Sequence, residues 1–337
     1  MIAYPALLAL RRLPGLEKLT LITTPSIRPF GELLGIFDEI IVVRDNRGLL
    51  TLAVDSLQAF RKLFRYDALV DLEIHSRLTT VFSLLTAARN RLGFFTDISY
   101  WRRHLNTHLL FCNTSNGIYL FYDQLAAVFG TLPVEGAECE REFRSRLGEH
   151  EFKTVDSTRI AIAPACSGLS RERMLRREEW VDIVARRIAG LRSETGVELH
   201  LLGAPSDRED LAQMATLLDA RFMGRATVYN HAGETNLRES VRIVAAMQEV
   251  LCIDSAILHF SRLLGRRTVS FWGPTDPRTL IRPNPGDLDE ISYVKISCSP
   301  CVHVSNQPPC RGQNICMRLA FDPAASLPRN QPWVLME

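Results

Sequence analysis

One stretch decides the fold class: Val250-Leu-Cys-Ile-Asp254-Ser255-Ala256-Ile-Leu-His259-Phe260-Ser-Arg-Leu-Leu-Gly265. The apolar run up to Ile253 is typical of a strand buried on both faces, and an apolar helix follows until Gly265. Asp254 and Ser255 separate the two elements, and one interpretation is that they only cap the helix. In the other interpretation, the helix N-terminus binds a phosphate. His259 would then face the same ligand, unless it is a structural histidine.

The same alternation of short apolar runs and longer amphipathic stretches extends along the chain in both directions. It predicts an α/β protein whose parallel sheets are covered by helices. The predicted strands are Leu19–Thr23, Glu39–Val43, Ala68–Leu72, Arg159–Ala163, Val197–Leu202, Val250–Ile253, Thr268–Trp272 and Ile291–Ile296, with helices such as Glu178–Ala189 and Leu237–Met247.

The length of 337 residues favours two domains. A polar stretch, Val134–Thr158, is the predicted linker between an N-terminal lobe of residues 1–145 and a C-terminal lobe of residues 146–337.

Composition excludes several classes of protein. With 46% hydrophobic and 23% charged residues the chain is typical of packed globular proteins, and a net charge of +2 gives no field of the kind nucleic-acid binders carry. The chain has no uninterrupted apolar segment long enough for a membrane-spanning helix. The apolar start, residues 1–10, lacks a basic leader, so we expect a cytoplasmic protein with reduced or metal-bound cysteines.

Three more predicted strands end in small or hydroxyl-bearing residues. These ends are Gly273-Pro-Thr275-Asp-Pro277, Gly203-Ala-Pro-Ser-Asp207, and Pro164-Ala-Cys-Ser167-Gly168 followed by Arg171 and Arg173. Each could be an ordinary turn, and the arginines could be a solvated helix start. Together with Asp254-Ser255, however, they predict a pocket for a nucleoside diphosphate, with arginine as the phosphate ligand.

These motifs, in this order, resemble those of the ADP-heptose:lipopolysaccharide heptosyltransferases, glycosyltransferase family 9. The resemblance rests on the strand ends above, on Gly233-Glu-Thr235-Asn-Leu237, and in the first half on Tyr66–Asp71 and Arg91-Leu-Gly93. It extends over essentially the whole chain. It implies a GT-B fold, in which two Rossmann-like lobes face a central cleft, the first binding the acceptor and the second the donor.

The resemblance also implies a function and a set of site residues. The function is inverting, metal-independent transfer of heptose from ADP-heptose to a lipid-linked sugar of the lipopolysaccharide inner core, without a required cofactor. Arg173 or Arg171 takes the place of a lysine that neutralises the leaving diphosphate, since only 4 of the 40 basic residues are lysine. The implied donor-binding residues are Ser167, Arg171, Arg173, Asp207, Thr235, Asp254, Ser255, Ala256, His259, Gly273 and Thr275.

Two departures from the family pattern leave alternatives open. The aspartate that acts as base in the family would fall just upstream of Met1, together with the first strand, so no catalytic residue is assigned within the chain. Either the start is misplaced or the protein binds sugar nucleotide without turnover; an epimerase on the same fold is a third hypothesis. In addition, Ala256 stands where the family has glycine, which requires a negative φ at that position.

Two further signals concern metals and membranes. Cys298, Cys301, Cys310 and Cys316 have spacing compatible with a structural zinc site, with unligated thiols as the alternative, whereas Asp287-Leu-Asp289 is a weak candidate for a metal site. We also expect a peripheral approach to the inner face of the inner membrane through apolar and basic residues of the first lobe. Those residues are Phe60, Arg61, Phe64, Arg65, Arg77, Phe94, Phe95, Trp101, Arg102 and Arg103.

Overall fold

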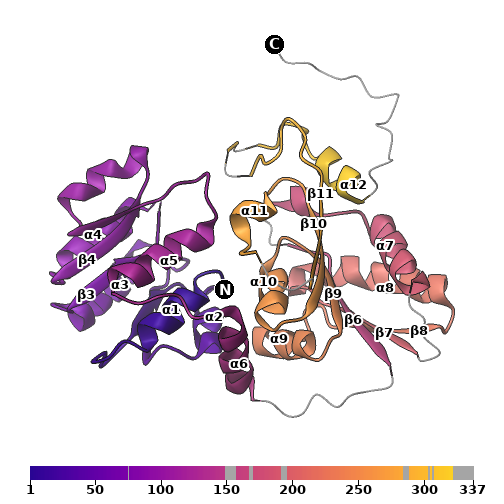
Figure 1. Ribbon diagram of the computed structural model, residues 1–337, viewed down its shortest axis with the longest axis horizontal. Coiled ribbons are helices and arrows are strands. Elements are labelled where there is room, and N and C mark those ends of the chain that lie inside the picture. The colour runs from indigo at the N-terminus through magenta and orange to yellow at the C-terminus, as the bar shows by residue number, and fades with distance from the viewer. Residues whose placement is uncertain are drawn as a thin grey trace. The chain divides into compact units, whose positions relative to one another are not determined.

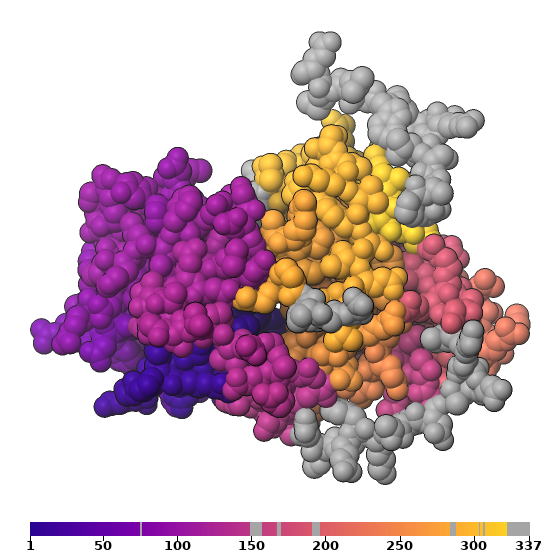
Figure 2. All heavy atoms as spheres, viewed as in Figure 1, coloured from indigo at the N-terminus to yellow at the C-terminus, as the bar shows by residue number. Residues whose placement is uncertain are grey.

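The computed structural model describes residues 1–74, 76–148, 157–166, 170–190, 196–283, 288–302, 304–305 and 307–321. The chain divides into two compact units: unit 1 is Met1–Gly148 with Thr279–Arg282, and unit 2 is Glu149–Arg278 with Pro283–Glu337. All strand pairs within the described residues are parallel, which confirms the predicted α/β class (Figure 1). Figure 2 shows the surface of unit 1 in indigo to magenta and that of unit 2 in magenta to yellow.

Unit 1 contains a pair of strands, β1-β2, and a sheet of three strands in the order β3-β4-β5. Its elements are α1 (Tyr4–Arg11), β1 (Thr20–Thr23), α2 (Arg28–Leu34), β2 (Glu39–Val42), α3 (Leu49–Leu63), β3 (Ala68–Asp71), α4 (Arg77–Leu85), β4 (Asn90–Phe95), the 3₁₀ helix η1 (Asp97–His104), β5 (His108–Phe111), α5 (Ile118–Val128) and α6 (Gly136–Leu147).

Two apolar clusters hold unit 1 together. In the larger one, Leu92 and Phe94 of β4 pack with Leu10 of α1 and with Phe121 and Leu125 of α5. In the smaller one, Ile41 of β2 packs with Ala59 and Leu63 of α3, and Phe82 of α4 lies against them. Each side chain buried in this way contributes about 1.5–3 kcal/mol of transfer free energy.

The predicted linker, Val134–Thr158, is wrong for its first half, because α6 forms there. This helix buries Cys139, Phe143 and Leu147, which are spaced four residues apart and so lie on one face. The ring of Phe143 meets that of Tyr4 edge-on, with the centroids 5.8 Å apart. A narrow apolar stripe among many charges is therefore enough to anchor a helix to unit 1.

Unit 2 contains one parallel sheet of six strands in the order β11-β10-β9-β6-β7-β8. Its elements are β6 (Thr158–Ala163), η2 (Arg171–Arg173), α7 (Arg177–Ala189), β7 (Val197–Leu201), η3 (Pro205–Asp207), α8 (Arg208–Phe222), β8 (Ala226–Asn230), α9 (Leu237–Ala245), β9 (Glu249–Ile253), α10 (Ala256–Leu263), β10 (Arg267–Trp272), α11 (Pro277–Leu280, whose last two residues belong to unit 1), β11 (Asp289–Tyr293) and α12 (Ile315–Phe321).

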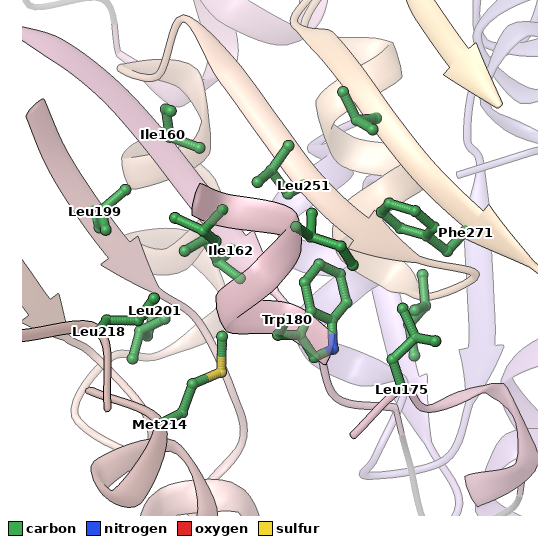
Figure 3. Packing of buried hydrophobic residues seen from close by; sticks show 14 of the residues in the cluster. Ile160, Ile162, Leu175, Trp180, Leu199, Leu201, Met214, Leu218, Leu251 and Phe271 are labelled. Atoms are coloured by element: carbon green, nitrogen blue, oxygen red, sulfur yellow. The ribbon is translucent and has the colours of Figure 1, made fainter. Parts of the chain in front are cut away.

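Helices cover both faces of the unit 2 sheet, with α7 and α8 on one side and α9 and α10 on the other (Figure 1). Figure 3 shows the first of these interfaces, where Trp180 of α7 packs among Ile162, Leu251 and Phe271 of three different strands. The rings of Trp180 and Phe271 meet edge-on at 5.7 Å. All five residues of β9 are buried, as its continuous apolar run predicts.

The strand order of unit 2 defines a switch point. From β6 the chain proceeds outward to β7 and β8, and it then returns to the opposite side of β6 to form β9. The loops after β6 and β9 therefore leave neighbouring strands in opposite directions at the carboxyl edge. Such a point is where open α/β sheets usually bind their ligands.

Candidate functional site at the carboxyl edge of unit 2

An arginine and an aspartate meet at the switch point. Arg173 comes from the loop after β6, and Asp254 directly follows β9. Arg173 Nη1 donates to the main-chain oxygen of Asp254 at 2.8 Å and to its Oδ2 at 3.3 Å. Both side chains are largely buried, with 18% of Arg173 and 9% of Asp254 exposed. The arginine is thus held in place by a carboxylate before any ligand arrives.

Two hydroxyls at this edge have no partner among the described residues. They are Ser255 Oγ, after β9, and Thr275 Oγ1, after the neighbouring β10. Ser255 is the N-cap residue of α10 but makes no side-chain capping bond, so the capping interpretation does not account for it. A buried hydroxyl without a partner costs about 1–3 kcal/mol, which a ligand with phosphate or sugar oxygens would recover.

Ala256 is compatible with a site at this helix start. It is the first residue of α10, and it is absent from the residues with positive φ. Its methyl group is exposed, so it introduces no backbone strain at the place where the family has glycine.

His259 lies one turn into α10, and its Nε2 is 3.9 Å from Asp254 Oδ1. Burial lowers the pKa of His259 to about 3, so the imidazole is neutral at physiological pH and the contact with Asp254 is not a charged pair. A neutral imidazole can still donate or accept one hydrogen bond at each ring nitrogen.

Gly273 and Thr275 belong to a loop that is packed from behind. A Cβ on Gly273 would lie 2.7 Å from Cys316 Sγ and 2.8 Å from Met317 Sδ, so only glycine lets the loop approach α12 this closely. The main-chain N–H groups of Cys301 and Val302 both donate to Pro274 O at 3.0 Å. Sequence reasoning missed this support, because nothing in the motif indicates which segment packs behind it.

Asp207 and Thr235 follow β7 and β8 and are engaged locally. Asp207 Oδ2 accepts from the main-chain N–H of Ala204 at 2.9 Å, and Thr235 Oγ1 bonds Ser240 Oγ at 2.8 Å. The two loops are joined by the N–H of Gly233, which donates to Gly203 O at 3.1 Å. Both side chains therefore have a structural role in the free protein, whatever else they bind.

Cys166 connects the Asp207 loop electrostatically with the switch point. Burial raises the pKa of its thiol, Arg173 lowers it, and the carboxylates of Asp207 and Asp254 raise it. One thiol thus senses charges from the ends of β6, β7 and β9. The structure brings these three strand ends together, as the sequence predicts.

The remaining predicted donor residues fall into two groups. Arg171 is exposed at the start of η2 and makes no contact with Asp254, so the geometry selects Arg173 over Arg171 as the arginine of this edge. Ser167 lies outside the described residues.

The metal hypotheses gain no support. Among the residues that the structure describes, no group of three or more His, Cys, Asp or Glu side chains is arranged to hold a metal ion. Cys298, Cys301, Cys310 and Cys316 are free thiols. Asp289 lies in β11 and accepts hydrogen bonds from Arg262, while Asp287 is outside the described residues.

Part of the predicted membrane surface is wrong. Phe94 and Arg102 are both buried: Phe94 packs in the core of unit 1, and the Arg102 guanidinium donates to main-chain oxygens, so neither can meet a lipid. In the described part of the chain, no helix is both long and apolar enough to span a bilayer.

Comparison with known proteins agrees with this geometry. The family model described as glycosyltransferase family 9 (heptosyltransferase) matches residues 118–310, more than half of the chain. Lipopolysaccharide heptosyltransferase 2 of Salmonella typhimurium is 30% identical over 82 residues, which are 24% of this chain and 23% of that protein. Lipooligosaccharide heptosyltransferase 2 of Haemophilus influenzae is 25% identical over 123 residues, 34% of this chain and 35% of that protein. The chain thus aligns with well under two thirds of these relatives' length.

Solved structures show the same fold over most of the chain. E. coli ADP-heptose lipopolysaccharide heptosyltransferase II matches with a TM-score of 0.63 and 16% identity over 94% of both chains. E. coli heptosyltransferase WaaC with ADP-2-deoxy-2-fluoro heptose matches with a TM-score of 0.66 and 16% identity, covering 87% of this chain and 89% of that one. A UDP-GlcNAc 2-epimerase from Methanocaldococcus jannaschii follows at 0.50 and 10%, covering 81% and 80%. These likenesses show the fold alone and confirm the GT-B architecture. By its family match, the chain belongs to glycosyltransferase family 9, the heptosyltransferases.

Proposed function

We propose that the chain is a heptosyltransferase that binds ADP-heptose at the carboxyl edge of unit 2. The observation that carries the proposal is the Arg173–Asp254 pair at the switch point, flanked by the unpartnered hydroxyls of Ser255 and Thr275. A held cation, free hydroxyls and the N-terminus of α10 are the groups that recognise a diphosphate. The solved relative that contains an ADP-heptose analogue supports the choice of donor.

In the proposed reaction, an acceptor hydroxyl attacks the anomeric carbon of heptose. The bond from that carbon to the diphosphate oxygen breaks with inversion, the hydroxyl proton passes to a carboxylate base, and ADP leaves. Arg173 and the N–H groups at the start of α10 meet the charge that develops on the diphosphate, so the step as proposed uses no metal ion. Asp254 would accept hydrogen bonds from donor hydroxyls. No residue of the chain is assigned as the base.

The proposed acceptor is a lipid-linked sugar of the lipopolysaccharide inner core, reached at the cytoplasmic face of the inner membrane. The curated relatives, which are lipopolysaccharide and lipooligosaccharide heptosyltransferases, support this acceptor class. Unit 1 would bind the acceptor, in accordance with the resemblance.

The cysteine segment has a structural place in this proposal. Cys301 and Cys316 both lie against the loop Gly273–Thr275, from the sides described above. We propose that the segment fixes this loop, and a structural zinc ion held by the four thiols stays a prediction. Metal analysis of the purified protein decides it: one equivalent of zinc supports the ion, and none supports free thiols.

Calorimetry with ADP tests the donor site. Arg173→Gln should weaken ADP binding at least tenfold, because a charge-assisted contact to phosphate is lost. Arg171→Gln is the matched control and should bind ADP as the wild type does. Equal affinities of all three proteins would remove the donor-site assignment.

A transfer assay with ADP-heptose and a lipid-linked core acceptor tests the reaction separately. Release of ADP with growth of the acceptor supports the heptosyltransferase. Binding of ADP without transfer supports a sugar-nucleotide-binding protein without turnover, and an altered free sugar without acceptor supports an epimerase.

A further inference from the structure

Helices α3 and α4 of unit 1 turn apolar side chains outward. On α3, Leu50, Val54, Leu57, Arg61 and the C-cap residue Phe64 are exposed and recur every three or four residues, which places them on one stripe. The opposite side of the helix, with Asp55, Ala59 and Leu63, is buried. The stripe is therefore a continuous outer face of a well-seated helix.

On α4 the usual amphipathic pattern is reversed. Its buried residues are Thr80 and Ser83, whereas Leu78, Val81 and Leu85 are exposed, Leu78 by 66%. The inward hydroxyl of Thr80 is used structurally, since it donates to Asp71 Oδ2 at 3.0 Å. A helix of a water-surrounded domain normally places its leucines inward, so an inverted helix indicates an outer surface that meets something apolar.

The two helices belong to one surface. Phe82 of α4 packs against the cluster that contains Ala59 and Leu63 of α3, so α3 and α4 are neighbours. We call their exposed residues the α3–α4 face. Its apolar members are Leu49, Leu50, Val54, Leu57, Phe64, Leu78, Val81, Leu84 and Leu85.

The charge of the α3–α4 face has a single sign. Arg61, Arg65 and Arg77 are exposed on it, and none of the three has an ion pair among the described residues. Between Asn46 and Tyr66 the only acidic residue is Asp55, which is buried and bonded to Arg44, and there is none between Ser76 and Thr96. Leucines bordered by arginines without accessible carboxylates are complementary to a layer of acyl chains beneath anionic headgroups.

We propose that the α3–α4 face docks on an anionic lipid bilayer. The α3 and α4 helices each follow the carboxyl end of a parallel strand, β2 and β3, so Leu49, Leu50 and Leu78 at their starts lie toward the carboxyl edge of unit 1. The inference deepens the proposed function, on which the choice of a lipid surface partly rests, because a lipid-linked acceptor is carried in such a bilayer. It replaces the surface predicted from sequence, which included the buried Phe94 and Arg102.

Co-sedimentation of the full chain with vesicles tests the proposal. Vesicles of phosphatidylcholine are compared with vesicles that also contain phosphatidylglycerol. The wild type should bind the anionic vesicles, and both Leu50→Ser with Leu57→Ser and Leu78→Ser with Leu85→Ser should bind them about tenfold more weakly. Arg61→Gln with Arg77→Gln should reduce the binding and its sensitivity to salt.

The controls lie in unit 2. Met223→Ser with Val304→Ser removes two apolar side chains that are equally exposed, and Arg221→Gln with Arg225→Gln removes two exposed arginines. Both control variants should bind vesicles as the wild type does. Circular dichroism and urea unfolding check that every variant is folded.

Three results would overturn the inference: no binding of the wild type to anionic vesicles, equal binding to both kinds of vesicle, or an equal loss in the control variants. A wild-type dimer in sedimentation that the leucine variants dissociate, with vesicle binding unchanged, would assign the face to a second copy of the chain. ADP binding is measured on the same variants and should be unchanged. Failure of the membrane proposal thus stays distinct from failure of the donor site.

Discussion

Thr275 is the residue where binding and stability oppose each other. Its side chain is buried, and its hydroxyl finds no partner among the described residues. The same hydroxyl lies beside the Asp254 strand, because β10 and β9 are adjacent and in register at Phe271 and Ile253. A group that costs stability in the free protein is understandable if a ligand satisfies it.

Thr275→Val should separate these two effects. The variant removes the hydroxyl while keeping the shape, so we expect the free energy of unfolding to rise by about 1 kcal/mol, and ADP affinity to fall about tenfold. Urea unfolding and calorimetry measure the two quantities.

Thr80→Val is the matched control, since Thr80 is also buried but bonded to Asp71. It should lose about 1–2 kcal/mol of stability with unchanged ADP affinity. A loss of stability in Thr275→Val would contradict the assignment, because it would mean that the hydroxyl has a partner within the protein.

Asp55 gives a prediction of pH dependence. Arg44 donates to Asp55 from its side chain and from its main-chain N–H, and this lowers the pKa of the carboxyl from 3.8 to about 2. A depressed folded-state pKa stabilises the protein above the unfolded value, and that stabilisation is lost as the pH falls through the folded value. The stabilising effect should therefore fade between pH 4 and pH 2.

Asp55→Asn should unfold more easily than the wild type at pH 6, and the difference should shrink as the pH falls from about 4 to about 2. Urea unfolding at a series of pH values measures it. The exposed pair Arg28–Glu32 gives a control, because Glu32→Gln should have little effect at any pH. A constant difference for Asp55→Asn across this range would show that the carboxylate charge is not what stabilises the site.

At the scale of elements, Arg102 ties η1 to the sheet of unit 1. It is fully buried, and its guanidinium donates to the main-chain oxygens of Glu73 at 2.7 Å, Phe94 at 2.9 Å and Ser76 at 2.7 Å. Asp71 lies 3.8 Å away, so the charge is partly balanced. One side chain thus satisfies the loop after β3 and the end of β4 at once.

Arg102→Lys should lose about 3–5 kcal/mol of stability, because an ammonium group cannot reach three carbonyls in the geometry of the guanidinium fork. Urea unfolding measures the loss. The neighbouring Arg103 is exposed, and Arg103→Lys should change stability by less than about 0.5 kcal/mol. If Arg102→Lys were as stable as the wild type, the three bonds would not be limiting for unit 1.

The sequence predicts those elements whose pattern is set by burial on both faces. β9 and β10 were expected within one residue of their bounds, since their apolar runs are continuous. The expectation failed where tertiary contacts decide: β4 contains Arg91 and Gly93, and Gly93 is required because a Cβ there would lie 2.3 Å from Asn106 Nδ2. The edge strand β8 alternates in exposure and was missed, and β11 begins and ends earlier than expected.

The candidate site follows the same division. Asp254, Ser255 and Thr275 could be assigned from strand ends, because parallel strands bring their carboxyl ends to one edge. The choice of Arg173 over Arg171 could not, since it depends on which arginine the short helix η2 turns toward Asp254. Likewise, the packing of Cys316 and Met317 behind Gly273 comes from a segment more than forty residues away, which no local pattern reveals.

At the scale of the whole molecule, the proposed functions are divided between the two units. Arg173, Asp254, Ser255 and Thr275 belong to unit 2, and the α3–α4 face belongs to unit 1. Unit 2 also has its own six-stranded sheet and its own core. A domain with a complete core and a complete set of ligand groups can bind its ligand alone.

Residues 149–337 expressed alone should therefore fold and bind ADP within about threefold of the full chain, whereas residues 1–148 should not bind it. Only the short segment Thr279–Arg282, which belongs to unit 1, loses its contacts in this experiment. One such contact is Arg282 with Asp123 at 2.6 Å, and Arg282→Gln in the full chain serves as the control for its loss. If the isolated unit 2 shows native circular dichroism but no ADP binding while Arg282→Gln still binds, unit 1 must supply part of the donor site, because the missing contact alone would then not explain the loss.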